Sequence, residues 1–447
     1  MEKLFGTDGI RAIAGQFPLD YSSVCILGKA LISLLMEEGR EPRVIIGRDT
    51  RESGTWLEQA LFQGINEGQE KAVSAGVIPT SAISFLTKKY LFSAGIVISA
   101  SHNPYQDNGI KIFSSQGTKI SEAWEEKLEK AIQTSKEIVK RKKIRIVPDS
   151  SFGQDYMAFL KSHFSQVNLK KKIKIILDCS NGASSFLAPK IFKDLGFDVT
   201  AINNTPNGKN INANCGSLFP QNLAKKVMES NADIGIAYDG DADRAIWIDE
   251  KGNILNGDHT LFVLSNFMKE KKCLKSDHVV ATIMSNLGLE KALEKFDLKL
   301  LRTQVGDKYV LEQMITSKSN LGGEQSGHTI FLDDCPTGDG ILTTIKMLEA
   351  MATQNVPLSR LIEDFKEYPQ VLVNVQVGKK IDFNRFPEII KTMEEIEDRL
   401  GDTGRLNLRY SGTEPLARIM IEGTDKEQIQ HYAQQMADVI SKHLGAI

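Results

Sequence analysis

The sequence has few of the features that mark secreted, membrane-spanning or nucleotide-triphosphate-binding proteins. It contains 5 cysteines among 447 residues, and none stands in a CxxC pair or a zinc-binding spacing. The longest apolar stretch near its start, Val24 to Met36, is interrupted by Lys29 and is too short to span a bilayer. GxxxxGK[ST], a GxGxxG after a strand, HExxH and the kinase signatures are also missing. We therefore expect a cytoplasmic protein with reduced thiols and no nucleotide-triphosphate site.

Charge of one sign is not in excess either. There are 55 lysines and arginines against 57 aspartates and glutamates, so the net charge is −2. This balance carries no sequence-wide signal for nucleic acid or for an anionic membrane, and we expect neither as a partner. The oligomeric state is left open, with a homodimer as one alternative.

What is present is the composition of a globular protein. Apolar residues make up 41% and charged residues 25%, which excludes a disordered, collagen-like or coiled-coil chain. A length of 447 residues is roughly three times the ~150 residues of an average domain. We therefore expect several domains, each with its own core.

Short runs rich in valine and isoleucine alternate along the chain with amphipathic stretches of helical length. The predicted strands are 44–46, 95–98, 173–177, 234–237 and 279–281, and the predicted helices include 56–67, 123–132 and 187–195. This alternation favours parallel sheets covered by helices. Similar polar turns follow three of the strands, at 47–54, 178–184 and 282–288. Their spacing indicates that one α/β unit occurs three times.

The last part of the chain has a different pattern. From Tyr368 onward, valines alternate at positions 371, 373, 375 and 377, and a helix, a strand and a final helix follow. This pattern predicts a small α+β domain. With further changes of composition near 148 and 252, the predicted domains are 1–148, 149–252, 253–368 and 369–447.

The first motif that could carry chemistry is Ser99–Pro104, which directly follows a predicted strand. Polar side chains at the carboxyl end of a strand gather where α/β proteins bind ligands. Ser101 beside His102 could be a nucleophile beside a base, but we expect adjacent side chains on one backbone not to meet. A hydrolase triad is therefore not favoured, and no GxSxG elbow is present.

The second motif places Asp239, Asp241 and Asp243 at alternate positions after a predicted strand. From an extended backbone their carboxylates point the same way, and a hard divalent cation relieves their repulsion. The segment partly matches a calcium loop, but Arg244 stands where that loop requires glycine, and strands rather than helices flank it. Three carboxylates with room for another ligand suit Mg²⁺ attached to a phosphate. The alternative is a solvated acidic turn.

Three further segments could bind a sugar phosphate. Glu324, Ser326 and His328 alternate in a glycine-rich stretch, so an extended loop would present all three to sugar hydroxyls. Between positions 409 and 418, two hydroxyls flank a glycine in a turn whose backbone N–H groups can converge on a phosphate, with arginine at either side. Near the amino terminus, a glycine-containing turn carries Arg11.

Together and in this order, five motifs resemble those of the α-D-phosphohexomutase superfamily over essentially the whole chain: Thr7–Arg11, Ser99–Pro104, Asp239–Arg244, Gly323–His328 and Arg409–Arg418. The resemblance implies four domains around a central cleft, three of them related α/β units with mixed sheets and the last a smaller α+β domain. It also implies an isomerase that is an intramolecular phosphotransferase. A serine, phosphorylated at rest, transfers its phosphoryl group to a sugar monophosphate, and the bound sugar 1,6-bisphosphate turns over and returns its other phosphoryl group.

The same resemblance assigns roles at the reacting centre. Ser101 would carry the phosphoryl group. One Mg²⁺ would be held by this phosphoserine together with Asp239, Asp241 and Asp243. The groups surrounding the transferring phosphoryl group would be Arg11, His102 and Lys111. Of these, Lys111 or His102 would handle the proton of the sugar hydroxyl.

Roles in substrate binding are implied in the same way. Arg244 would lie beside the metal loop, and sugar hydroxyls would be bound by Glu324, Ser326 and His328. The non-reacting phosphate would be held by Arg409, Ser411, Gly412, Thr413 and Arg418. A phosphate anchored there would let either end of the bisphosphate reach the serine.

Finer features resemble the bacterial phosphoglucosamine mutases within this superfamily. They are Gln325, where mannose and glucose mutases more often have methionine, and the segments 210–217 and 304–310. This likeness implies a hexosamine phosphate substrate: glucosamine 6-phosphate and glucosamine 1-phosphate would be interconverted for amino-sugar nucleotide and peptidoglycan precursor synthesis.

Three positions depart from the usual pattern, namely Ala12 for glycine, Lys308 for arginine and Tyr410 for proline. None removes a reacting group. The nearest alternative is the same chemistry on mannose or glucose phosphates. A regulator that binds metal or sugar phosphate without catalysis would be expected to have lost Ser101, an aspartate or Lys111. A metal-dependent phosphatase would leave the serine loop and the separate phosphate loop unexplained.

Overall fold

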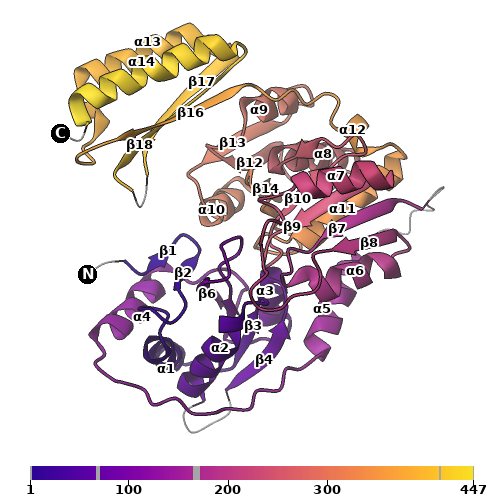
Figure 1. Ribbon diagram of the computed structural model, residues 1–447, viewed down its shortest axis with the longest axis vertical. Helices are drawn as coiled ribbons and strands as arrows, with labels where there is room; N and C mark the ends of the chain where they lie inside the picture. The colour runs from indigo at the N-terminus through magenta and orange to yellow at the C-terminus, as the bar shows by residue number, and fades with distance from the viewer. Residues whose placement is uncertain (1–2, 67–70, 165–171, 412–413, 446–447) are drawn as a thin grey trace. The chain divides into compact units, whose positions relative to one another are not determined.

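Four sheets organise the chain into three α/β domains and a smaller C-terminal domain, as the resemblance implied (Figure 1). The computed structural model describes residues 3–66, 71–164, 172–411 and 414–445. The chain divides into two compact units, residues 1–282 with 301–363, and residues 283–300 with 364–447. Within the described ranges, none of the helices combines the length and apolar character needed to cross a bilayer.

The first domain is built on a six-stranded sheet of order β1-β2-β6-β5-β3-β4. Its elements are β1 (Phe5–Gly6), β2 (Gly9–Ile13), α1 (Tyr21–Glu37), β3 (Val44–Arg48), α2 (Glu52–Ile65), β4 (Ala72–Val77), α3 (Thr80–Lys89), β5 (Ala94–Ile98), β6 (Asp107–Ser114) and α4 (Glu122–Thr134). The central strand β5 is buried on both faces, which explains its unbroken apolar run. Helix α1 begins where the Asp20 side chain accepts the N–H groups of Ser22 and Ser23.

The second and third domains have sheets of five and four strands, ordered β11-β10-β9-β7-β8 and β13-β12-β14-β15. The second contains α5 (Ser151–Ser162), β7 (Lys174–Asp178), α6 (Ser184–Asp194), β8 (Asp198–Ile202), α7 (Gln221–Ser230), β9 (Ile234–Tyr238), β10 (Ala245–Ile248) and β11 (Ile254–Leu255). The third contains α8 (Gly257–Glu270), β12 (His278–Thr282), α9 (Leu287–Glu294), β13 (Lys299–Thr303), α10 (Asp307–Ser317), β14 (Leu321–Gly323), β15 (Thr329–Phe331), α11 (Gly340–Gln354) and α12 (Leu358–Leu361). The predicted strands and helices are all found, except that the end of the first predicted helix, Glu67, lies outside the described residues.

One strand order is repeated in the three α/β sheets. The neighbours run β4-β3-β5-β6 in the first, β8-β7-β9-β10 in the second and β13-β12-β14-β15 in the third. In the first two sheets, three parallel strands are followed by an antiparallel fourth. In the third, β12 and β14 are parallel and β15 is antiparallel. The threefold occurrence of one α/β unit is therefore confirmed.

The mixed sheets that the resemblance implied are confirmed at this fourth strand, where the parallel pairing that the alternation favoured ends. The connections that lead to β6, β10 and β15 are residues 99–106, 239–244 and 324–328. Parallel strands need a crossover of a dozen or more residues, so chains this short must return antiparallel. All three connections are segments that the sequence singled out for chemistry, and the repeated unit thus places each of them at an equivalent strand end.

The fourth domain is an antiparallel sheet of order β16-β18-β17 covered by two helices (Figure 1). Its elements are β16 (Gln370–Gln376), η1 (Phe383–Arg385), α13 (Pro387–Leu400), η2 (Gly401–Thr403), β17 (Gly404–Tyr410), β18 (Leu416–Gly423) and α14 (Lys426–Leu444). The alternating valines of β16 pack with α14 residues such as Met436 in one core. Apolar residues therefore alternate along β16 because only one face of the sheet is covered by helices.

Candidate active site

Ser101 stands at the tip of the first hairpin connection, in the left-handed backbone region with φ 50°. Its Oγ donates a hydrogen bond to Asp239 Oδ2 at 2.5 Å and lies 3.3 Å from His102 Nδ1. The expectation that these adjacent side chains do not meet is wrong, because a left-handed residue turns the chain sharply between them. A hydrolase triad is still not formed, since among the described residues no carboxylate hydrogen-bonds to the His102 ring, whose Nδ1 also lies 3.2 Å from the Arg244 guanidinium.

Two side chains from distant segments clamp the backbone of the serine loop. Arg51 Nη2 donates to the carbonyls of Ser101 and Asn103, at 3.1 and 2.6 Å. Asn212 Nδ2 donates to the same two carbonyls, at 2.9 and 3.0 Å. On the remaining side lies Gly240, where a Cβ would come within 2.5 Å of the Ser101 carbonyl oxygen. The loop is therefore held on three sides, and glycine is needed for the closest approach.

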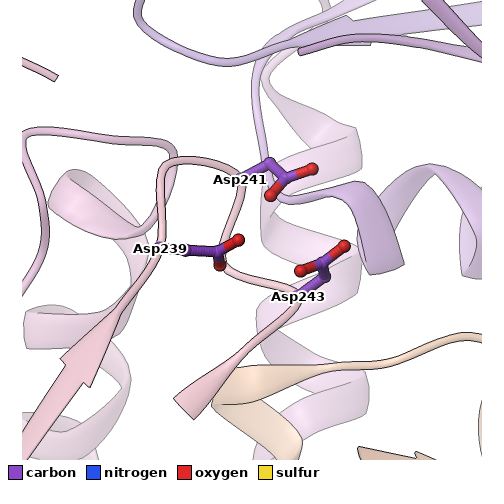
Figure 2. A group of neighbouring side chains, drawn as sticks. All are labelled: Asp239, Asp241 and Asp243. Carbon is purple, nitrogen blue, oxygen red and sulfur yellow. The ribbon is translucent and has the colours of Figure 1, made fainter. Parts of the chain in front are cut away.

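The three aspartates of the second connection face one another (Figure 2). One carboxylate oxygen from each lies within 4.8 Å of the others, and all three residues are buried. Burial and repulsion from Asp243 and Asp241 raise the pKa of Asp239 well above its usual value. Asp241 Oδ1 and Asp243 Oδ1 are buried without a hydrogen-bond partner. The predicted convergence is confirmed, and the group could hold a metal ion. The expected extended backbone is wrong, because the segment is a turn in which Ala242 has φ 57°.

Cations from the first domain meet these carboxylates. Lys111 Nζ lies 2.9 Å from Asp241 Oδ2, 3.2 Å from Asp243 Oδ2 and 2.9 Å from Asp8 Oδ2. The same Asp8 oxygen lies 2.5 Å from Arg11 Nη2. Arg11 and Lys111 come from the neighbouring strands β2 and β6, so the sheet itself places both cations beside the aspartate loop.

The protonation states follow from this arrangement. Burial alone would lower the pKa of Lys111, but the nearby carboxylates, Asp241 foremost, raise it well above its usual value. Burial and then the positive charges of Arg244 and Arg11 lower the pKa of His102 to about 4. At neutral pH, therefore, Lys111 carries a positive charge and His102 is a neutral imidazole.

The segment with Glu324, Ser326 and His328 is a tight turn, so the predicted extended loop is wrong. The Glu324 N–H donates to the His328 carbonyl at 2.8 Å, and the Gly327 N–H donates to the Glu324 carbonyl at 3.0 Å. Gly327 has φ 94°, and a Cβ there would lie 2.4 Å from the Ala245 carbonyl oxygen. Glycine at this position lets the chain reverse between two strands, where alternate spacing alone had suggested an extended chain.

The three side chains of this turn consequently have different surroundings. Ser326 Oγ lies 3.5 Å from Glu324 Oε2, and both residues are half-buried. His328 is buried: its Nε2 accepts the Gly338 N–H at 3.0 Å, and its Nδ1 lies 3.7 Å from Asp243 Oδ2. His328 thus connects this turn to the aspartate loop, while Glu324 and Ser326 remain partly accessible.

Gln325 ties the turn to helix α8. Its side-chain Nε2 donates to Asp258 Oδ2 at 3.1 Å, and its carbonyl accepts the Gly257 N–H at 2.9 Å. Gln325 therefore orients the turn through the start of this helix.

Residues predicted to bind phosphate lie together in the C-terminal domain. Arg409 and Arg418 stand opposite each other on β17 and β18. Burial and the charge of Arg418 lower the pKa of Arg409. Arg418 Nη2 lies 3.3 Å from Ser411 Oγ and 3.0 Å from Glu414 Oε2. The turn is therefore rich in positive charge, with one carboxylate at its edge.

The structure brings most predicted residues into two groups. The group in the first compact unit contains Arg11, Ser101, His102, Lys111, Asp239, Asp241, Asp243, Arg244, Glu324, Ser326 and His328. The group in the second unit contains Arg409, Ser411 and Arg418. Two further predicted residues, Gly412 and Thr413, lie outside the described residues.

Sequence reasoning assigned no role to several groups that the structure places at the site. Asp8 was in a recognised motif, and Arg51 follows a strand end in a polar turn, so a signal existed for both. Asn212 reaches the serine loop from more than a hundred residues away, and Lys380 Nζ donates to the Ser411 carbonyl at 2.6 Å. These two contacts depend on the folded arrangement, which local spacing does not indicate.

Family models match nearly the whole chain. They describe the phosphoglucomutase/phosphomannomutase α/β/α domains I, II and III and the C-terminal domain, at residues 2–139, 154–252, 256–368 and 372–439 respectively.

Curated relatives and solved structures agree with these matches. The chain is 44% identical over 452 residues to the phosphoglucosamine mutase of Syntrophus aciditrophicus, with 100% of both chains covered. It is 44% identical over 458 residues to that of Caldicellulosiruptor saccharolyticus, again with 100% of both chains covered. Its fold is similar to a phosphoglucomutase/phosphomannomutase family protein from Burkholderia thailandensis, with TM-score 0.80, 21% identity and coverage of 98% of this chain and 97% of that one.

Proposed function

We propose that this chain, which belongs to the phosphoglucomutase/phosphomannomutase family, is a phosphoglucosamine mutase that interconverts glucosamine 6-phosphate and glucosamine 1-phosphate. The observation that carries the proposal is the 2.5 Å hydrogen bond from Ser101 Oγ to Asp239 Oδ2, beside two further aspartates. It places a hydroxyl that can be phosphorylated against a carboxylate group that can hold a cation. The likeness to the curated relatives over their full length supports glucosamine phosphate as the substrate.

Mg²⁺ is the metal that fits the donor set. The residues that would hold it are Ser101, in its phosphorylated form, with Asp239, Asp241 and Asp243. Two buried oxygens without hydrogen-bond partners, Asp241 Oδ1 and Asp243 Oδ1, offer the hard ligands that this ion prefers. When bound, the ion would supply Lewis acidity and a template for the phosphoryl group.

In the proposed reaction, a hydroxyl of the sugar monophosphate attacks the phosphorus carried by Ser101. The new bond from the sugar oxygen to phosphorus forms as the bond from Ser101 Oγ to phosphorus breaks, and the hydroxyl proton passes to Ser101 Oγ. His102 is neutral at neutral pH and its Nδ1 lies 3.3 Å from Ser101 Oγ, so we assign it the transfer of this proton. Lys111 stays protonated, and its charge, with that of Arg11, stabilises the negative charge of the group in flight.

The second half of the reaction reverses these steps at the other end of the sugar. The bound 1,6-bisphosphate turns over and returns its other phosphoryl group to Ser101, so a bisphosphate also serves as activator. Sugar hydroxyls would be bound by Glu324 and Ser326, while the buried His328 would fix this turn against the aspartate loop and Arg244 would lie beside the transferring group. The non-reacting phosphate would be held by Arg409, Ser411, Gly412, Thr413 and Arg418.

The experiment that tests the proposal compares kcat/KM for glucosamine 1-phosphate, mannose 1-phosphate and glucose 1-phosphate. Each assay contains Mg²⁺ and glucose 1,6-bisphosphate as activator. We expect the amino sugar to be preferred by about 100-fold, because a site built to bind a substrate group rejects analogues that lack it. Equal or better turnover of mannose or glucose phosphate would overturn the substrate assignment. Turnover of none of the three would overturn the proposed activity.

A further inference from the structure

Two ion pairs of opposite polarity join residues 119–122, which lead into helix α4, to the start of helix α10. Lys119 Nζ lies 2.7 Å from Asp307 Oδ1, and Lys308 Nζ lies 2.6 Å from Glu122 Oε1. Lys119 and Glu122 belong to the first domain, and Asp307 and Lys308 are the first two residues of α10 in the third. Both pairs lie within the first compact unit.

The pair of Lys119 with Asp307, here called the inner pair, extends toward the catalytic cations Arg11 and Lys111; the pair of Lys308 with Glu122 is called the outer pair. Lys119 Nζ also lies 2.7 Å from Asp8 Oδ1 and 3.1 Å from the Thr7 carbonyl oxygen. The other oxygen of Asp8 contacts Arg11 and Lys111, at 2.5 and 2.9 Å. Lys119 is therefore one ion pair removed from both cations proposed to stabilise the transferring group, and only 17% of its side chain is exposed.

The inner pair also extends toward residues 324–328, here called the sugar-binding turn. Asp307 Oδ2 lies 3.6 Å from His328 Nε2, and the N–H of the preceding Gly306 donates to Glu324 Oε1 at 3.2 Å. His328 Nδ1 in turn lies 3.7 Å from Asp243 Oδ2, which also contacts Lys111. The groups therefore lie in a closed ring, in the order Asp8, Lys119, Asp307, His328, Asp243 and Lys111. The approach of Asp307 to His328 is a contact and not an ion pair, because His328 Nε2 accepts the Gly338 N–H.

We propose that Lys119 is a positioning residue that sets the sugar-binding turn of the third domain relative to the catalytic cations of the first. This role rests on the proposed mutase function. The chemistry requires it, because in-line transfer to a bound sugar depends on the spacing between the turn that holds the sugar and the group that carries phosphate. Lys119 contacts Asp307, at the start of α10 in the third domain, and also Asp8, which contacts the catalytic cations of the first domain.

The outer pair fixes the alignment of the same two segments. Glu122 is 62% exposed, so its pair with Lys308 contributes little stability by itself. Its polarity is the reverse of the inner pair, however. A displacement that exchanged partners would bring Lys119 toward Lys308 and Glu122 toward Asp307, so repulsion opposes this exchange. Lys308, which departs from the family's usual arginine, thereby gains a defined partner.

The first test replaces Lys119 by methionine, which keeps the length and removes the charge. We expect kcat on glucosamine 1-phosphate to fall roughly 10- to 100-fold, as for a misplacement of reacting groups, with a smaller change in the thermal midpoint than in kcat. Lys119→Arg should lie closer to wild type. Lys127→Met is the matched control, because Lys127 is 61% exposed on α4 and its ion pair with Glu37 is long, at 3.8 Å. A Lys119→Met enzyme within twofold of wild type would overturn the role.

The second test exchanges the charges of the outer pair. Glu122→Lys and Lys308→Glu should each lower kcat/KM by about threefold to tenfold, since each places like charges together at the segment junction. The double exchange should return to within about twofold of wild type. Additive losses in the double variant would contradict alignment by this pair.

The failure of this proposal can be told apart from the failure of the proposed function. An inactive wild-type protein would contradict the proposed function, whereas an active wild type with an unaffected Lys119→Met enzyme contradicts only the role of Lys119.

Discussion

Lys111 and Arg409 are both cations beside loops that we assign to phosphate chemistry, but their surroundings differ. Lys111 is buried among three carboxylates, of Asp8, Asp241 and Asp243. Arg409 stands across the strands from another arginine, Arg418, whose charge contributes to lowering its pKa. Like charges placed directly opposite each other in a sheet are destabilising. The charge of Lys111 is therefore neutralised by carboxylates before any ligand binds. The repulsion between Arg409 and Arg418, in contrast, would be relieved by a bound anion.

This difference fits the two tasks that a mutase must separate. The group around Lys111 holds fixed charges at set distances around a serine, as transfer of a phosphoryl group requires. The arginine pair presents surplus positive charge, as capture of a phosphate dianion requires. The following predictions test whether the two regions differ in this way.

The largest expected effect concerns the aspartate group. Asp241→Asn keeps the size of the side chain but removes one of three converging charges, so we expect Mg²⁺ affinity to fall by at least about 100-fold and activity with it. The measurement is a Mg²⁺ titration of activity and of binding by calorimetry. Asp198→Asn, at an exposed position on β8, is the control and should leave both unchanged. An unchanged metal dependence of Asp241→Asn would contradict the metal site.

A second prediction compares stability in the two regions. Lys111→Met leaves three carboxylates without their shared partner in a buried site, which should cost about 3–5 kcal/mol in the free energy of unfolding. Arg409→Met removes one of two repelling charges and should change that free energy by less than about 0.5 kcal/mol. Urea unfolding with a chelator present measures both. Equal losses in the two variants would show that the two regions are not differently balanced.

The third prediction concerns ligand affinity at the arginine pair. Arg409→Met should raise KM for the sugar phosphate roughly 10- to 100-fold, since one charge-assisted hydrogen bond contributes about 1.5–3 kcal/mol. Inorganic phosphate should raise the thermal midpoint of the wild type more than that of this variant. Arg399→Met, at an exposed position on α13, serves as the control. If Arg409→Met binds substrate and phosphate normally, the anion site lies elsewhere.

The smallest effect is expected at the clamp on the serine loop. Asn212→Ala removes two hydrogen bonds to the Ser101 and Asn103 carbonyls, while Arg51 still holds both. We expect kcat to fall by about fivefold, corresponding to roughly 1 kcal/mol of lost positioning. Asn222→Ala, at an exposed position on α7, is the matched control. A rate equal to wild type would mean that Arg51 alone positions the loop.

The sequence predicted elements better than it predicted how they connect. Runs such as Val44–Ile46 are buried on both faces, so their apolar character is continuous and readily recognised. Strand direction is not encoded in that character, so only the family resemblance implied mixed sheets; the short connection before each fourth strand explains why that strand is antiparallel. Gly327 is likewise a turn signal, but the alternation of Glu324 and Ser326 predicts an extended loop.

At the site, motif residues were predicted and their supporting contacts were not. Asp239, Asp241 and Asp243 follow one strand end within five residues, so local spacing was enough to bring them together. The contacts of Asn212 and Lys119 join segments that are 111 and 188 residues apart in the chain. Such pairs depend on the packing of whole domains. Asn212 lies in the segment 210–217 that resembles the phosphoglucosamine mutases, but that likeness does not indicate which loop its side chain contacts.

The most direct test of the account is the phosphorylation of Ser101. The protein is incubated with glucose 1,6-bisphosphate and Mg²⁺, and the modified residue is located by peptide mass spectrometry. Mutase turnover of wild type and of Ser101→Ala is measured in parallel. We predict a phosphoryl group on Ser101 alone, and a loss of turnover of at least about 1000-fold in Ser101→Ala, because the group that carries phosphate is missing. Phosphorylation at another residue, or full activity in Ser101→Ala, would contradict the phosphoserine mechanism.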